Sequence, residues 1–245
     1  MRSRFFLFTS ILFLTSFWVL SVPAFAAASA GEIRLPQESE SLVRTALLLG
    51  LMAFLPALVI SMTSFVRIVI VLSMIRHALG MPETPPNTVL VSLALFMTAL
   101  SMGPTLQQSA STGLQPFLDG SKSIAAAMED GGAPLKQFML KQVRDTDLKT
   151  IYEIAKKPLP KTEADVELMQ LVPAFMLNEL RTAFTIGFVI LLPFLLIDLV
   201  VSAILLSLGM LMVPPATISL PLKILMFVLI DGWGLILEGV MGSFR

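Results

Sequence analysis

Four charged side chains interrupt segments that are otherwise apolar, and their types could support chemistry. They are Arg67, Asp198, Lys223 and Asp231. A charge at the centre of a membrane helix costs about 2.5 to 3.5 kcal/mol on the insertion scale, so each should face protein or water. Such residues either fix helix register as buried ion pairs or form the relay of a proton- or ion-coupled transporter. Both alternatives remain open at this point.

The sequence contains few of the side chains that enzymes use for catalysis. The sequence has no cysteine and a single histidine, His77, so thiolate chemistry and histidine clusters are excluded. It also lacks a Ser-His-Asp or HExxH arrangement. We therefore predict a protein that is not an enzyme and that has no cofactor or metal.

The composition indicates a membrane protein. Of 245 residues, 56% are hydrophobic and only 14% are charged, well below the roughly one quarter usual in soluble domains. The mean hydropathy is +0.85. The 17 basic and 17 acidic residues leave no net charge to attract nucleic acid, so we expect no nucleic-acid partner.

The N-terminal residues have the pattern of a cleavable secretory signal. Met1–Arg4 is a charged region, an apolar run follows to Leu20, and Ala24-Phe25-Ala26 is a small-residue cleavage site. We predict a signal peptide over residues 1–26, followed by an extracytoplasmic segment over residues 27–41.

Four apolar stretches define the elements that must position the charges. The first two should form a bent helical hairpin over residues 42–106, with Gly103-Pro104 as a stop signal. The last two should form a second hairpin over residues 183–245, joined by an uncharged loop that contains Met210, Leu211 and Met212.

Residues 107–182 carry most of the charges and should form a small helical polar domain, interrupted by a break at Gly131–Pro134. The predicted fold is therefore all-α and polytopic, with two long hairpins flanking this domain. Counting crossings from a cleaved N-terminus puts the polar domain outside the cytoplasm and the Met-rich loop inside. Arg76 then lies at an inner helix end, in agreement with the positive-inside tendency.

The last apolar helix gains little from lipid. Its two charges, Lys223 and Asp231, roughly cancel the gain from its apolar residues, and it also contains Pro221, Gly232 and Gly234. Eight residues span about 12 Å along a helix, so these two charges cannot pair within one helix. We therefore expect partners on other helices or chains, in a multi-subunit assembly.

Three stretches of sequence resemble the FliP family and its virulence-secretion relatives. They cover both predicted hairpins in order, whereas residues 107–170 match only loosely. The stretches are Phe54–Asn87, with Met62-Thr63-Ser64-Phe65-Val66-Arg67; Pro173–Val200, with Glu179-Leu180-Arg181; and Thr217–Trp233, with Leu220-Pro221-Leu222-Lys223 and Ile230-Asp231-Gly232-Trp233.

The resemblance implies a core subunit of a type III protein-export gate in the bacterial inner membrane, at the flagellar basal body. Five copies would form a helical ring with FliQ, FliR and other export-apparatus membrane proteins, and unfolded substrates would pass through it. The polar domain would be periplasmic. Met210, Leu211 and Met212 would form the gate constriction, where relatives often carry three methionines.

The resemblance also adds Glu179 to the buried charges expected to act in assembly, which are Arg67, Glu179, Asp198, Lys223 and Asp231. The cleavable signal favours the flagellar version of the gate over the virulence version. An ion- or proton-coupled transporter is the alternative from another class.

Overall fold

The computed structural model describes residues 45, 49–50, 53–54, 56–81 and 83–244. The predicted signal peptide and the segment 27–41 lie outside the described residues. The chain divides into two compact units, Met1–Leu49 and Gly50–Arg245, and every feature below belongs to the second.

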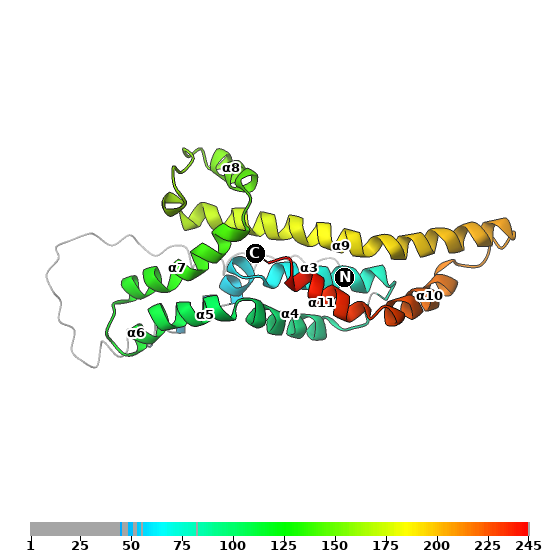
Figure 1. Cartoon of the computed structure of the whole chain (residues 1–245), viewed down its shortest axis with the longest axis horizontal. Coiled ribbons are helices and arrows are strands. Elements are labelled where there is room, and N and C mark those ends of the chain that lie inside the picture. Colours follow the sequence, from blue (N-terminus) through cyan, green and yellow to red (C-terminus); the bar gives the residue numbers. More distant parts are fainter. Residues whose placement is uncertain (1–44, 46–48, 51–52, 55, 82, 245) are drawn as a thin grey trace, which may run out of the picture. The chain divides into compact units, whose positions relative to one another are not determined.

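The described residues are helical or loop, with no strand among them, so the predicted all-α class is confirmed (Figure 1). The helices of the apolar regions are α3 (Phe65–Ala78), α4 (Asn87–Ser101), α9 (Leu168–Ser207), α10 (Ala216–Leu229) and α11 (Gly232–Met241). Between α4 and α9 lie α5 (Gly103–Ser109), the π-helix η1 (Ala110–Leu114), α6 (Gln115–Leu118), α7 (Ile124–Gln142), α8 (Asp145–Ile154) and the 3₁₀ turn η2 (Glu163–Asp165).

The α9 helix dominates the second unit. Its 40 residues span about 60 Å, twice the roughly 30 Å of a bilayer core. It runs without a break across residues 182 and 183, where we expected a domain boundary. Among the described residues, α9 is the one single helix that is long and apolar enough to cross a membrane. If each bent helix pair is counted as one span, the number of possible spans rises to four.

Three apolar helices are bent. Pro56–Met62 meets α3 at 81°, α4 meets the following helix at 72°, and α10 meets α11 at 66°. The second apolar helix ends next to Gly103-Pro104 as predicted, because α4 stops at Ser101, and a new helix, α5, begins at Gly103. Proline fits the first turn of a helix, where its missing N–H would have no partner.

The first two bends lie against each other. The Ser64 amide donates a hydrogen bond to the Met102 sulfur over 3.4 Å, and Met102 is fully buried between α4 and α5. The Thr63 hydroxyl accepts a hydrogen bond from the Phe65 amide over 3.3 Å. Side chains thus satisfy backbone groups that the interrupted helix leaves open.

The predicted break at Gly131–Pro134 is wrong, because α7 continues through it. Pro134 cannot donate to the Asp130 carbonyl, but the Thr112 hydroxyl does so over 3.0 Å. Gly113 of η1 packs on Gly131 so closely that a Cβ at residue 113 would lie 2.6 Å from the Gly131 Cα. Packing against η1 therefore holds α7 intact.

The core is centred on α3, which contacts both α4 and α9. Its Ile68, Val71, Leu72 and Ile75 are at most 1% exposed. They belong to a cluster with buried residues of the other apolar helices, namely Leu90, Ala94, Ala183, Phe194, Phe227, Ile236 and Val240. A second cluster of Met139, Val166, Leu171 and Phe175 joins the start of α9 to α7 and to the loop before α9.

Candidate functional site

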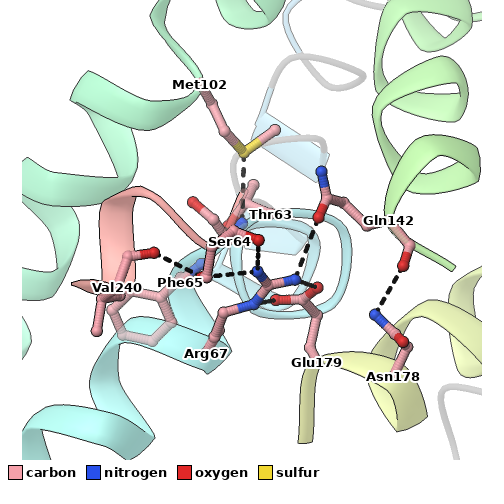
Figure 2. A network of polar contacts seen from close by, with 10 residues as sticks. Thr63, Ser64, Phe65, Arg67, Met102, Gln142, Asn178, Glu179 and Val240 are labelled. Carbon is pink, nitrogen blue, oxygen red and sulfur yellow. Dashed lines mark hydrogen bonds and ion pairs between the residues drawn. The ribbon is translucent and has the colours of Figure 1, made fainter. Parts of the chain in front are cut away.

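Arg67 is a fully enclosed charge, with 1% of its surface exposed, and it lies at the centre of a network of polar contacts (Figure 2). Its Nε donates to Glu179 Oε2 over 2.8 Å, and its Nη2 donates to Glu179 Oε1 over 2.5 Å. Glu179 lies on α9 and is fully buried. This fork geometry is the strongest form of an arginine–carboxylate pair.

The remaining Arg67 donors reach two further elements. Nη1 donates to the Ser243 carbonyl and hydroxyl, each over 2.9 Å, and Nη2 donates to Gln142 Oε1 over 3.3 Å. The Phe244 ring lies 4.1 Å from the guanidinium carbon. All five N–H groups of the guanidinium are thereby used. Arg67 joins α3, α9, the end of α7 and the residues that follow α11.

Lys223 is the second buried cation. Its Nζ lies 2.7 Å from Asp198 Oδ2 on α9 and donates to the Ala78 carbonyl over 3.2 Å. Ala78 ends α3, and a cation is favourable at the negative end of a helix. Both partners are on other helices of the same chain.

The two side chains of this second pair differ in exposure. The Lys223 side chain is 8% exposed, whereas that of Asp198 is 40% exposed. One side of the carboxylate is therefore open to water or to another chain.

Asp231 is exposed in the single chain, so its predicted burial in an assembly stays a prediction. It lies between α10 and α11 with φ 51° and ψ 56°, a left-handed conformation that aspartate tolerates better than most residues. A Cβ at Gly232 would lie 2.3 Å from the Phe227 ring, so this close approach requires glycine. The expected single helix through Lys223 and Asp231 is thus two helices, and no ion pair of Asp231 occurs among the described residues.

Met210, Leu211 and Met212 form the turn between α9 and α10. Gly209, with φ 74°, ends α9, and the Met210 amide donates back to the Leu205 carbonyl over 2.9 Å. The exposed fractions are 41% for Met210, 75% for Leu211 and 95% for Met212. The loop therefore presents uncovered apolar side chains at the end of the longest helix.

Sequence reasoning missed one buried charge. The Asp147 side chain is 1% exposed and lies 2.7 Å from the Arg181 guanidinium, which ties α8 to α9. Asp147 is in the first turn of α8, where acidic residues are common on surfaces, so its sequence position gave no signal. Arg181 follows Glu179 by two residues and was the available clue.

The described residues contain no group of three or more His, Asp or Glu that could hold a metal. Two ion pairs, Arg67–Glu179 and Lys223–Asp198, instead join one apolar helix to another. The fold and site define an all-helical membrane-type protein whose apolar helices are joined by ion pairs.

Comparison with known sequences gives the family. A sequence model of the FliP family matches residues 48–240, and the chain belongs to that family. It is 47% identical over 228 residues to the flagellar biosynthetic protein FliP of Caulobacter vibrioides, covering 91% of this chain and 86% of that protein. The protein of the same name from Pectobacterium carotovorum is 48% identical over 82% of this chain and 78% of its own length. The Bacillus subtilis protein is 46% identical over 85% of this chain and 95% of its own.

Proposed function

We propose that this chain is a core subunit of the flagellar type III protein-export gate, forming part of the channel through which unfolded flagellar proteins leave the cell. Membership of the FliP family supports a component of the flagellar export apparatus. In this proposal five copies and the partners FliQ and FliR form a helical ring in the inner membrane. Each copy contributes its two hairpins, and the domain over residues 107–182 faces the periplasm.

The observation that carries the proposal is the Met-rich turn. Met212 is 95% exposed and Leu211 is 75% exposed, although both are apolar, and they lie in the turn that follows a 40-residue helix. Exposed apolar surface of this kind marks an interaction site. In a ring of copies, these turns converge on the axis and cover one another.

Such a turn suits a gate for varied polypeptides. Methionine is flexible and polarizable, so it deforms around different chains. An apolar constriction also closes to ions by dewetting, without fixed polar contacts that would hold a passing substrate. Leu211 preserves the apolar seal, with less flexibility than a third methionine.

A transporter relay is less compatible with the geometry. The five N–H groups of Arg67 are all occupied by Glu179, Gln142 and Ser243. A side chain with no free donor holds helices together and is poorly placed to pass an ion along.

The proposal is tested in a strain whose own gene for this protein is deleted. The parent chain should restore swimming and secretion of flagellar proteins. The Met210→Ala/Met212→Ala variant should assemble but leak small ions at rest, measured as membrane conductance and potassium loss. Met128→Ala/Met169→Ala is the matched control, because these methionines are 67% and 79% exposed but lie elsewhere.

Failure of the parent chain to restore secretion would reject the export role. Normal conductance in the assembled Met210→Ala/Met212→Ala gate would place the seal elsewhere.

A further inference from the structure

The first of the three helix bends has no local cause. Sharp bends occur almost always at proline, at glycine–serine pairs, at π-bulges or where a foreign side chain enters the backbone hydrogen-bond ladder. Gly103-Pro104 lies at the second bend and Asp231-Gly232 at the third. The first bend follows Met62, within a run that contains no proline or glycine from Ala57 to Leu79. A side chain from another helix must therefore impose it.

Met102 is that side chain. Its sulfur accepts the hydrogen bond of the Ser64 amide over 3.4 Å, and both residues are fully buried. In a continuous α-helix the Ser64 amide would donate to the Ile60 carbonyl instead, which is a stronger acceptor than a thioether sulfur. The sulfur thus takes the place that the preceding turn of the same helix would otherwise fill.

Ser64 already suits the continuous form. Its φ of −65° and ψ of −4° lie in the right-handed helical region. Its buried hydroxyl has no hydrogen-bond partner in the part of the chain that the structure describes. A serine or threonine inside a helix can donate to the carbonyl four residues earlier, as Ser61 and Thr63 do here. Straightening would offer the Ile60 carbonyl to both the amide and the hydroxyl of Ser64.

The short helix before the bend, Pro56–Met62, has few contacts that straightening would break. Its Leu58 and Ile60 side chains are apolar, yet they are 38% and 45% exposed. On the other side of the bend, the ion pair between Arg67 and Glu179 anchors α3 to α9. The short helix can therefore change direction while α3 stays in the core.

Length separates the two forms. The 14 residues of α3 span about 21 Å, which is less than the roughly 30 Å of a bilayer core. One straight helix over residues 56–78 would span about 34 Å. Only the straight form is long enough to cross a bilayer.

We propose that the first bend is a joint with two positions, set by Met102. With Met102 seated against Ser64, the helix is bent as in this structure. With Met102 withdrawn, residues 56–78 form one straight helix. Packing of the α4–α5 pair on α3 therefore converts a helix that can span a membrane into a bent one.

The lack of cysteine in the sequence permits a distance test on the full chain in detergent. Spin labels at Ala57→Cys/His77→Cys, both exposed positions, report the bend by double electron–electron resonance. The two Cα atoms would lie about 30 Å apart in a straight helix and about 24 Å apart with the 81° bend. The parent chain should give the shorter distance, and Met102→Ala should lengthen it by about 6 Å.

Three further variants separate the joint from general disruption. Met139→Ala is the matched control, because Met139 is equally buried but belongs to the other core cluster, and it should keep the shorter distance. Proline fits the φ of Ser64 but clashes with the carbonyl of a preceding helical turn, so Ser64→Pro/Met102→Ala should return to the shorter distance. Met102→Leu keeps the bulk and removes the acceptor, so it should show both distances.

An unchanged distance in a Met102→Ala chain that retains its helix content by circular dichroism would overturn the proposal. The longer distance in the parent chain, or in Ser64→Pro/Met102→Ala, would overturn it as well. If Met102→Ala loses helix, Met102→Leu decides, and the shorter distance alone in that variant would reject the joint. None of these readouts measures secretion or ion leakage, so the outcome is independent of the export role.

Discussion

Arg67 and Lys223 are both buried cations paired with a carboxylate of α9, but their surroundings differ. The Arg67–Glu179 side chains are 2% and 1% exposed, and five hydrogen bonds complete the guanidinium. The Asp198 side chain of the other pair is 40% exposed. The first site is complete within one chain, whereas the second leaves part of its carboxylate available to neighbours. Arg67 therefore serves the fold of the subunit, whereas a further role for Lys223 in assembly stays a prediction.

The largest effect is expected at Arg67. Arg67→Ala leaves Glu179 buried without a counter-charge, which should destabilise the chain by about 3 to 5 kcal/mol. Thermal unfolding in detergent and the yield of folded protein would measure the loss. Arg67→Leu/Glu179→Leu is the control, because removal of both charges should restore much of the stability. A stable Arg67→Ala chain would contradict the assigned role.

A smaller effect is expected at Lys223. Lys223→Ala removes the hydrogen bonds to Asp198 and Ala78, which should cost about 1.5 to 3 kcal/mol, because Asp198 can recover contact with water. The larger consequence should be a lower yield of assembled complex, measured by native gel or mass spectrometry. Complexes of normal size and yield would show that this pair has no part in assembly.

The residues after α11 should contribute less again. Ser243→Ala removes one acceptor from Arg67 and keeps the Ser243 carbonyl, so a loss of about 1 kcal/mol is expected. A double-mutant cycle with Arg67→Lys measures the coupling directly. Strict additivity of the two substitutions would mean that the contact contributes nothing to stability.

The smallest effect on the isolated chain is expected at Asp231. Asp231→Asn keeps an exposed residue that tolerates the left-handed conformation, so stability should change by about 0.5 kcal/mol or less. Asp231→Val should cost more, because a β-branched residue is strained there. Equal stability of the two variants would remove the backbone argument.

The sequence was informative about which residues are unusual and less so about their partners. Arg67, Asp198 and Lys223 stand out because their apolar neighbours make a charge costly. The contact between Arg67 and Glu179 spans 112 positions, and no local pattern encodes it. Ser243 uses its carbonyl as well as its hydroxyl, and every residue has a carbonyl.

Helix breaks were harder to predict for the same reason. Pro56 is helical, and the first bend falls after Met62, where Ser64 meets the sulfur of Met102. Pro134 lies inside α7 because Thr112 supplies the missing donor. Proline signals helix ends from local geometry, but tertiary contacts decide whether a helix tolerates it.

The sequence separation between Arg67 and Glu179 also determines how soon this ion pair can form during protein synthesis. At synthesis rates of about 5 to 20 residues per second, the 112 positions that separate them take roughly 6 to 22 s to add. The ion pair cannot form until Glu179 has been added to the chain. Ser243 comes 176 positions after Arg67, so the hydrogen bonds from Arg67 to Ser243 can form only after the ion pair with Glu179. A nascent chain that stops before α9 therefore holds Arg67 without its carboxylate partner.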